Sequence, residues 1–302
     1  MHAGSAARWY AVPVEPPPLP AILAAVGAAL DEDRARDDVT TLATIRADLM
    51  GKATFLAREP GVVAGLVVAE AAFRAIDAGV RFEPRLQDGD RFARRATLAI
   101  AHGRVQSLLQ VERVALNFLQ RLSGTATLTR AFVDAISGSD AVILDTRKTT
   151  PGLRALEKYA VRCGGGTNHR ADLAVMAMIK DNHREALARE GMSLAEGVAA
   201  IRAFSSARAG GVAVPVEVEI DSLDDLEAAL AGRPEWVLLD NMGVEAMAEA
   251  VARADGRAKL EASGGVRLES VTRIARTGVD AISVGALTHS ARSLDITLEL
   301  AF

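Results

Sequence analysis

The chain has one cysteine among 302 residues, Cys163, so no disulfide can form within it, and no Cys/His spacing typical of zinc sites is present. No apolar run reaches the length needed to cross a bilayer. The first 20 residues lack the basic-then-apolar layout of a signal peptide, and their prolines predict an extended lead-in. We therefore expect a cytoplasmic protein.

An excess of positive charge is also missing, because the formal net charge is -4. The whole chain therefore offers no basic field for nucleic acid or an anionic membrane. Half of its residues are hydrophobic and a quarter are charged, which is typical of an ordinary globular protein. The length suits one large domain plus a smaller one.

The first part of the chain predicts a mixture of helices and strands. Residues 19–34 have helical apolar spacing, and residues 51–76 predict a strand, a turn and a helix. Residues 94–124 predict a short strand and a long helix that ends near Gly124. On that helix Arg113, Asn117 and Arg121 are four residues apart and share one face.

From about Ala126 the pattern changes to repeated units of a strand followed by a helix. Six apolar segments predict the strands: "AVILDT", "AVMAMIKD", "VPVEVEID", "EWVLLDN", "AKLEASGG" and "DAISVGA", with a weaker candidate at Val161–Cys163. Pro151 suits a first helical position, Gly164 and Gly278 suit helix C-terminal caps, and Asp221 and Ser222 suit N-caps.

Such units predict a parallel sheet with helices outside it, either closed into a barrel or doubly wound. Nearly every predicted strand ends in polar residues or glycine. In a barrel all these ends converge on one mouth, whereas an open sheet uses only those near its switch point. The pattern therefore favours a barrel.

Basic residues dominate the first strand ends. Between Asp145 and Arg184 there are eight basic and four acidic residues, a local excess of four positive charges. Those on the predicted helix (Arg154, Lys158 and Arg162) are expected to be solvated. Those at strand ends are expected to face the mouth and bind an anion: Arg147, Lys148, Arg170 and Lys180, with His169 beside Arg170.

Glycines and acids dominate the later strand ends. Ser263, Gly264 and Gly265, with Gly285 in the next unit, suit a phosphate held by backbone N–H groups. Glu219 and Asp240 end neighbouring strands and suit Mg²⁺, or a salt bridge with a lysine, or both.

Two nucleophiles have to be weighed. A lone thiol such as Cys163 is usually a packed small hydrophobe, and no paired base accompanies it. Lys148 suits a Schiff base with a carbonyl substrate, as in barrel aldolases, so a lyase stays open as a rival function.

The runs "DTRKTTPGLRALEKYAVRCGGGTNHR", "IKDNH", "EVEIDS", "LLDNM", "EASGG" and "VGALTHS", in this order, closely resemble quinolinate phosphoribosyltransferase, the carboxylating nicotinate-nucleotide pyrophosphorylase. The resemblance runs from "DDVTT" at Asp37 to the end of the chain. It implies an N-terminal α/β sandwich domain (1–126), an incomplete α/β barrel of about seven strands (127–292), and a tail (293–302) that packs on the first domain.

The resemblance also implies an activity and partners. Quinolinate and phosphoribosyl pyrophosphate, with Mg²⁺, would give nicotinate mononucleotide, pyrophosphate and CO₂ in de novo NAD biosynthesis. The enzyme would be a dimer or a hexamer of dimers in which a neighbour's N-terminal domain closes each barrel mouth.

Roles carried over by motif are as follows. Quinolinate would be held by Thr146, Arg147, His169, Arg170 and, from the neighbouring subunit, Arg113. Lys148 and Lys180 would line the substrate and pyrophosphate pocket, and Glu219 and Asp240 would lie near the ribose hydroxyls and Mg²⁺. The ribose phosphate would lie on Ser263, Gly264, Gly265 and Gly285, beside His289.

Two further alternatives stay open. The segment between "NHR" and "IKDNH" is more apolar than the resemblance leads us to expect, which suits a diverged paralogue that accepts another base. A non-catalytic oligomer or regulatory protein would keep the barrel for ligand binding alone, although the intact acids and lysines argue against it.

Overall fold

The computed structural model describes residues 14–208 and 212–302. The predicted lead-in therefore lies outside the described residues up to position 13, and residues 14–18 form neither helix nor strand. The chain divides into two compact units within helix α4 (Val105–Ala135). The N-terminal unit comprises residues 1–130, 148–166 and 286–302, and the second unit comprises 131–147 and 167–285. Residues 148–166 and 286–292, assigned to the barrel domain from the sequence, thus group with the N-terminal unit.

The N-terminal unit is built on an antiparallel sheet with the strand order β12-β1-β5-β3. Its strands are β1 (Met50–Ala57), β3 (Arg81–Pro84), β5 (Thr97–Arg104) and β12 (Ile296–Ala301). Since β12 pairs with β1 from Ala57↔Ile296 to Lys52↔Ala301, the C-terminal tail belongs to this sheet. A small ribbon joins β2 (Gly61–Val62) to β4 (Arg91–Phe92).

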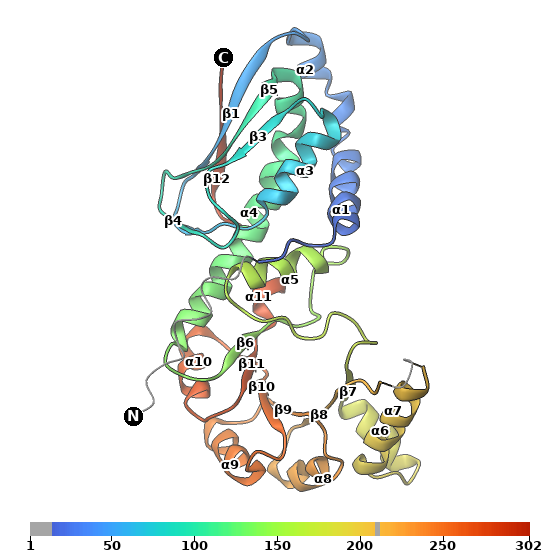
Figure 1. Cartoon of the computed structure of the whole chain (residues 1–302). Coiled ribbons are helices and arrows are strands. Elements are labelled where there is room, and N and C mark those ends of the chain that lie inside the picture. The colour runs from blue at the N-terminus through green and yellow to red at the C-terminus, as the bar shows by residue number, and fades with distance from the viewer. Residues whose placement is uncertain (1–13, 209–211) are drawn as a thin grey trace. The chain divides into compact units, whose positions relative to one another are not determined.

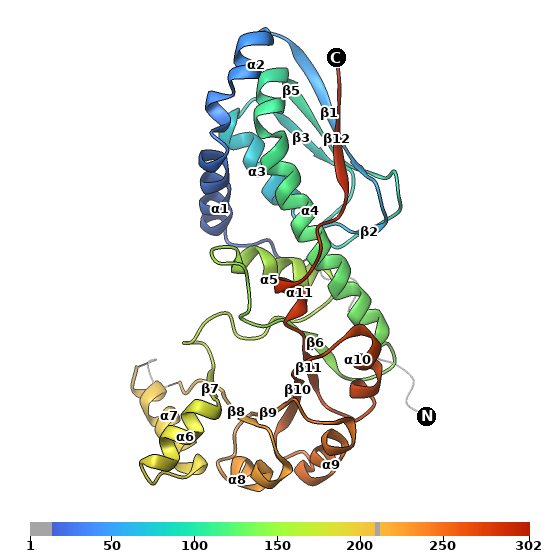
Figure 2. The same ribbon diagram turned by 180° about the vertical axis from the view of Figure 1, so that it is seen from behind.

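Helices cover one face of this sheet (Figures 1 and 2). They are α1 (Leu19–Glu32), α3 (Leu66–Ile76) and the first part of α4, with α2 (Val39–Thr44) after the short turn η1 (Ala35–Asp37). Phe55 of β1 and Phe73 of α3 meet edge to face in the core, with ring centroids 6.1 Å apart. Two more helices, α5 (Arg154–Cys163) and α11 (Ala286–His289), complete the unit.

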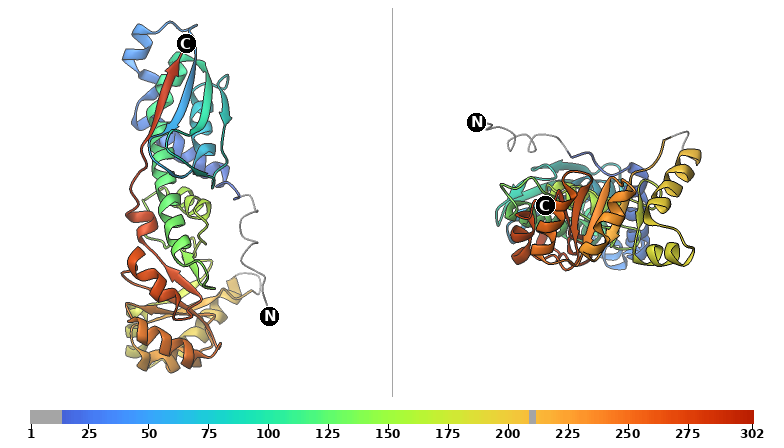
Figure 3. Two further views of the ribbon diagram at one scale, coloured as in Figure 1. Left: turned by 90° about the vertical axis from the view of Figure 1, so that its left-hand side faces the viewer. Right: turned by 90° about the horizontal axis from the view of Figure 1, so that it is seen from below.

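The second unit is an α/β structure on a parallel sheet with the strand order β6-β11-β10-β9-β8-β7. The six strands are those predicted from the sequence: β6 (Val142–Leu144), β7 (Ala177–Ile179), β8 (Val216–Ile220), β9 (Trp236–Asp240), β10 (Lys259–Ser263) and β11 (Ala281–Ser283). They lie side by side in an arc, seen from below in Figure 3, with helices outside it in Figure 1. Among the described residues no pairing joins β6 to β7, so the sheet stays open as an incomplete barrel does.

The helices of this unit are α6 (Asp181–Arg189), α7 (Leu194–Arg208), α8 (Leu226–Ala231) after the turn η2 (Leu223–Asp225), α9 (Val244–Ala254) and α10 (Leu268–Ala275). Helix α6 was not predicted, because its sequence has no apolar stripe and none of its residues is buried. Ser222 caps η2 as expected, its hydroxyl accepting the N–H of Asp224. None of the helices in the described part of the chain has the length and apolar character that a membrane span requires.

Helix α4 does not stop near Gly124, as the sequence suggested, but continues to Ala135. A Cβ at Gly124 would lie 2.0 Å from the carbonyl oxygen of Arg292, so this glycine admits a neighbouring backbone rather than ending the helix. The sequence thus singled out a glycine with a structural role, but that role is close packing and not the end of the helix.

Helix α5 corrects three other expectations. The weak strand candidate Val161–Cys163 is its last part, and Pro151 lies before the helix, which begins at Arg154. Every residue from Leu156 to Val161 is buried. Lys158, expected to be solvated, is only 5% exposed. Cys163 is packed as expected, and burial raises the pKa of its thiol.

Candidate active site

The predicted strand-end residues of the second unit gather at one edge of the parallel sheet. Lys180 follows β7, Glu219 lies near the end of β8, Asp240 and Ser263 end β9 and β10, and Gly285 follows β11. Asp240 and Ser263 face each other in register. Because all strand pairs are parallel, these residues share the carboxyl edge, where enzymes of this architecture carry their catalytic groups.

A lysine and an acid pair at this edge. The Nζ atom of Lys180 lies 2.7 Å from Oε2 of Glu219, whose side chain is 13% exposed. The salt bridge that the sequence left open is therefore present. A carboxylate bound to an ammonium group at a strand end can still take a cation on its second oxygen.

The loop after β10 has positive φ angles, which glycine adopts readily and other residues rarely adopt. Gly264 and Gly265 have φ values of 93° and 59°, and Asn241 after β9 has φ 55°. A Cβ at Gly264 would lie 2.2 Å from Oδ1 of Asn241, whose amide also donates to Asp240 at 2.7 Å. The loop thus lies against the end of β9, and such a glycine loop leading into helix α10 suits a phosphate group.

Asp145 explains why strand β6 runs into charged residues. Its side chain is fully buried, with Oδ1 accepting the backbone N–H of His169 at 2.9 Å and Oδ2 accepting the side-chain amide of Asn168 at 2.6 Å. The backbones also meet, because Leu144 forms a parallel bridge with Thr167. The motifs "DTRK" and "TNHR" are therefore joined directly.

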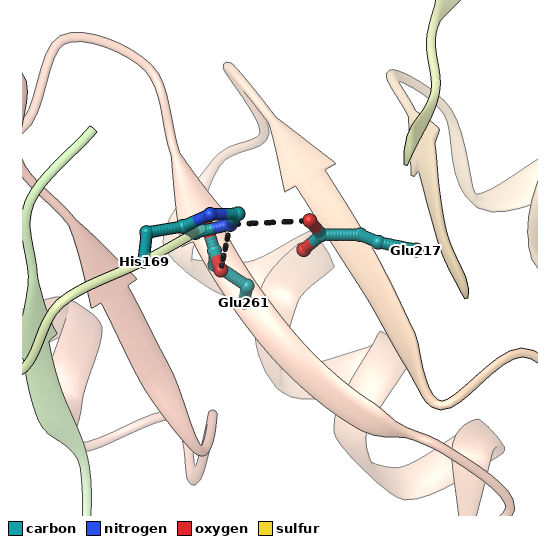
Figure 4. A group of neighbouring side chains, drawn as sticks. All are labelled: His169, Glu217 and Glu261. Atoms are coloured by element: carbon teal, nitrogen blue, oxygen red, sulfur yellow. Dashed lines mark hydrogen bonds and ion pairs between the residues drawn. The ribbon is translucent and has the colours of Figure 1, made fainter. Parts of the chain in front are cut away.

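His169 points inward against two buried glutamates (Figure 4). Its Nε2 lies 3.2 Å from Oε2 of Glu217 in β8 and 3.3 Å from Oε2 of Glu261 in β10. Its Nδ1 accepts the backbone N–H of Arg170 at 2.7 Å. Both ring nitrogens therefore have protein partners in this conformation.

Burial and hydrogen bonds shift the pKa values of His169 and Glu217 in this cluster. Burial opposes the charged ring, but the hydrogen bonds of Glu217 and Glu261 outweigh it and raise the pKa of His169 to about 9. Burial also raises the pKa of Glu217 to about 7, and the adjacent Glu261 adds to the effect.

The same geometry argues against a metal ion, although one nitrogen and two carboxylates lie within 4.8 Å of one another. A ring whose Nδ1 accepts a hydrogen bond carries its proton on Nε2, the nitrogen that would have to bind the metal. These three residues therefore form a hydrogen-bonded cluster.

Arg170 is a predicted site arginine whose pKa is shifted by its surroundings. Its guanidinium donates to the carbonyl of Met176 at 2.9 Å and contacts the sulfur of Met178. Burial and then the neighbouring charge of Arg147 lower its pKa, while Glu217 opposes them. Two guanidinium groups whose charges oppose each other in this way favour an anionic ligand.

Thr146 belongs to the second unit, after β6, whereas Lys148, His289 and Arg113 belong to the N-terminal unit. The carbonyl of Lys148 accepts the hydroxyl of Thr288, and His289 lies next to Ser290 at the end of α11. Arg113 is exposed on α4. Arg121, on the same predicted face, instead donates to the buried carboxylate of Glu157 at 2.8 Å, which makes it a structural residue.

Sequence reasoning missed Glu217, and it counted Glu261 and Asn241 among the polar strand ends but gave them, like Asp145, no role of their own. A signal was present for the two glutamates, because each stands between two apolar residues in a short strand of a parallel sheet, which is buried on both faces. No local signal marks Asn241, because its left-handed backbone depends on the loop that packs against it.

Comparison with known families decides the assignment. Residues 38–123 match the model of the quinolinate phosphoribosyl transferase N-terminal domain, and residues 125–299 match that of its C-terminal domain. The chain belongs to the quinolinate phosphoribosyltransferase family.

Relatives within this family align with nearly the whole chain. The chain is 46% identical to the carboxylating nicotinate-nucleotide pyrophosphorylase of Mycobacterium leprae, covering 90% of this chain and 94% of the relative. It is 40% identical to the chloroplastic enzyme of the same name from Oryza sativa, covering 99% and 83%.

Solved structures of the quinolinate phosphoribosyltransferase family share the fold. The nicotinate-nucleotide pyrophosphorylase of Francisella tularensis superposes with a TM-score of 0.87 at 36% identity, covering 96% of this chain and 99% of the other. NadC from Streptococcus pyogenes superposes with a TM-score of 0.84 at 40% identity, covering 91% and 95%.

Proposed function

We propose that this chain transfers the phosphoribosyl group of phosphoribosyl pyrophosphate to quinolinate and releases pyrophosphate and CO₂. The observation that carries the proposal is that Arg147 and Arg170 follow the joined segments at Leu144 and Thr167 and that the charge of Arg147 lowers the pKa of Arg170. Quinolinate has two adjacent carboxylates, and two guanidinium groups suit such a ligand better than one. The names of the relatives support the same reaction.

The predicted site residues would have separate roles. Arg147 and Arg170, with Thr146, His169 and Arg113, would hold quinolinate so that its ring nitrogen points at C1 of the ribose. The loop Ser263–Gly265, with Gly285 and His289, would hold the ribose phosphate. Breaking the bond between C1 and pyrophosphate leaves positive charge on the sugar, which Glu219 and Asp240 are suited to stabilise, while Lys148 and Lys180 neutralise the leaving group.

Decarboxylation needs little further help from the protein. Once the ring nitrogen is alkylated, the pyridinium withdraws electrons from the bond to the 2-carboxylate, and that bond breaks with its electron pair left on the ring. A proton then takes the place of CO₂. This chemistry requires position and charge rather than a nucleophile, which suits the packed thiol of Cys163 and leaves no task for a Schiff base on Lys148.

Mg²⁺ is part of the proposal. Glu219 and Asp240 offer hard oxygen ligands at neighbouring strand ends, and Mg²⁺ in such sites is bound by one or two carboxylates together with substrate phosphates. When bound there, it would stabilise negative charge on the pyrophosphate.

We also propose a homo-oligomer in which Arg113 completes a neighbouring site. Arg113 is exposed, and large exposed apolar residues occur in the same unit. They are Leu19, Leu23, Val39, Leu42 and Met50. A dimer or a hexamer of dimers, and a cytoplasmic location, remain predictions from the sequence.

Isothermal titration calorimetry with quinolinate and with nicotinate tests the ligand. The parent chain should prefer the dicarboxylate, and Arg147→Ala or Arg170→Ala should abolish both that preference and turnover. Arg276→Ala, an exposed arginine after α10, is the matched control and should behave like the parent. Unchanged quinolinate turnover in either site variant would contradict the proposal.

Mixing two inactive variants tests the shared site. If Arg113 acts in a neighbour's site, a hybrid of Arg113→Ala and Arg170→Ala subunits has one intact site, and random mixing of dimers should restore about a quarter of the parent activity. No recovery, with subunit exchange shown by mass spectrometry, would mean that Arg113 acts in its own subunit or not at all.

A further inference from the structure

Asn168–Arg170 belong to no helix or strand, yet three strands of the sheet hold them. The three anchors are carboxylates: Asp145 directly after β6, Glu217 within β8 and Glu261 within β10. Their exposed fractions are 0%, 0% and 1%. Together they bind the amide side chain, the backbone and the ring of this short segment.

Burial of three carboxylates in one unit is costly, because a charge loses its hydration when it leaves water. Apolar residues of similar size would stabilise a sheet interior at least as well. The hydrogen bonds of these carboxylates converge on the segment that carries Arg170, and the hydroxyl of Ser283 donates in turn to Glu261. A role in holding that segment accounts for their burial better than a contribution to stability does.

We propose that Asp145, Glu217 and Glu261 are positioning residues that set the specificity of the site for a dicarboxylate. The proposal rests on the function proposed above, in which Arg170 binds quinolinate. Asp145 fixes the backbone of His169, the two glutamates fix its ring, and Nδ1 of that ring accepts the N–H of Arg170. With the guanidinium held at Met176, Arg170 is fixed at both ends.

The same carboxylates let two like charges lie together before substrate binds. Arg147 destabilises the charged form of Arg170, and Glu217 stabilises it. Without the anchors we expect the two guanidinium groups to move apart. A site with separated arginines binds the single carboxylate of nicotinate almost as well, but it loses its advantage for the two adjacent carboxylates of quinolinate. The ratio of quinolinate affinity to nicotinate affinity therefore measures how well the two arginines are positioned.

The test uses the full-length chain with the nearly isosteric substitutions Asp145→Asn, Glu217→Gln and Glu261→Gln. Each should weaken quinolinate binding by about tenfold or more, the effect of losing one hydrogen bond to a charged group, and should lower the affinity ratio. The KM for phosphoribosyl pyrophosphate should change less than the affinity for quinolinate, because the hydrogen bonds of the three anchors go to Asn168 and His169 and not to the residues predicted to bind phosphoribosyl pyrophosphate.

Asp280→Asn is the matched control. Asp280 precedes β11 at the opposite edge of the same sheet, and its carboxylate accepts the backbone N–H of Leu260 at 2.8 Å. Its loss should lower the melting temperature but leave the affinity ratio unchanged. If an anchor variant does not fold, Ser283→Ala keeps all three carboxylates, removes one hydrogen bond to Glu261, and should weaken quinolinate binding by about two- to threefold.

Three results would overturn the inference. The first is parent-like quinolinate affinity in the folded anchor variants, and the second is an equal loss of the affinity ratio in Asp280→Asn. The third is a rise in melting temperature with stoichiometric Zn²⁺ that Glu217→Gln abolishes, since it would make the cluster a metal site. Parent-like quinolinate binding in Arg170→Ala would instead contradict the proposed function itself.

Discussion

Two glycines inside helices of the N-terminal unit should respond to alanine with opposite signs. Gly27 lies in α1, and no atom comes within 4 Å of the position of its missing Cβ. Gly124 lies in α4, where a Cβ would be 2.0 Å from the carbonyl oxygen of Arg292 and 3.3 Å from Cα of Ser293. Sequence alone treats the two positions alike.

The magnitudes follow from helix propensity and packing. Gly27→Ala should stabilise the protein by about 0.5–1 kcal/mol, because alanine loses less backbone entropy and meets no obstacle. Gly124→Ala gains the same propensity but forces a backbone segment to move, and such overpacking costs about 1–3 kcal/mol. The obstacle is a backbone carbonyl rather than a flexible side chain, so the upper part of that range applies, and the net loss should be about 2 kcal/mol.

Urea titrations followed by circular dichroism measure both variants against the parent chain. The expected result is a higher midpoint for Gly27→Ala and a lower one for Gly124→Ala, with similar slopes. The reasoning would be refuted if Gly124→Ala were as stable as Gly27→Ala, because the close approach of Arg292 would then impose no constraint on α4.

Other substitutions test other contacts. Arg121→Ala removes the cation beside the fully buried carboxylate of Glu157, so it should destabilise the protein by about 3–5 kcal/mol, whereas a melting curve of Arg113→Ala should match that of the parent. Hydrogen bonds from Arg292 and from the N–H of Asp295 lower the pKa of Glu59 to about 2. The ionised carboxylate of Glu59 therefore stabilises the folded protein fully above about pH 4.3, and this stabilisation is lost as the pH falls towards 2. Glu59→Gln should therefore lower the urea midpoint at neutral pH, and its difference from the parent should shrink at about pH 2.5; a constant difference would argue against this linkage. In Gly264→Ala the new methyl group meets Asn241, so this variant should raise the KM for phosphoribosyl pyrophosphate by about tenfold or more. In Gly265→Ala no atom lies within 4 Å of the new methyl group, so only the modest strain of a left-handed alanine is expected. Equal effects on the KM would show that the contact with Asn241 is unimportant.

The strands of the second unit could be predicted because parallel strands are buried on both faces and read as short apolar runs. The polar residues at their ends, such as Lys180 and Asp240, follow from the same pattern, since one sheet edge collects them all. Helix α6 was missed because none of its residues is buried and its sequence has no apolar stripe to detect.

The sequence determined by itself the family, the six parallel strands and their order along the chain, and which residues stand at the carboxyl edge, because these depend on motifs and on neighbours along the chain. Only the tertiary structure decided which charged residues are buried and what they hold. Asp145 meets Asn168 and His169 after 23 and 24 residues, and His169 meets Glu217 after 48. These partners come together because of the order of the strands in the sheet. A carboxylate loses its water, and so depends on its protein hydrogen bonds, only when the folded sheet buries it.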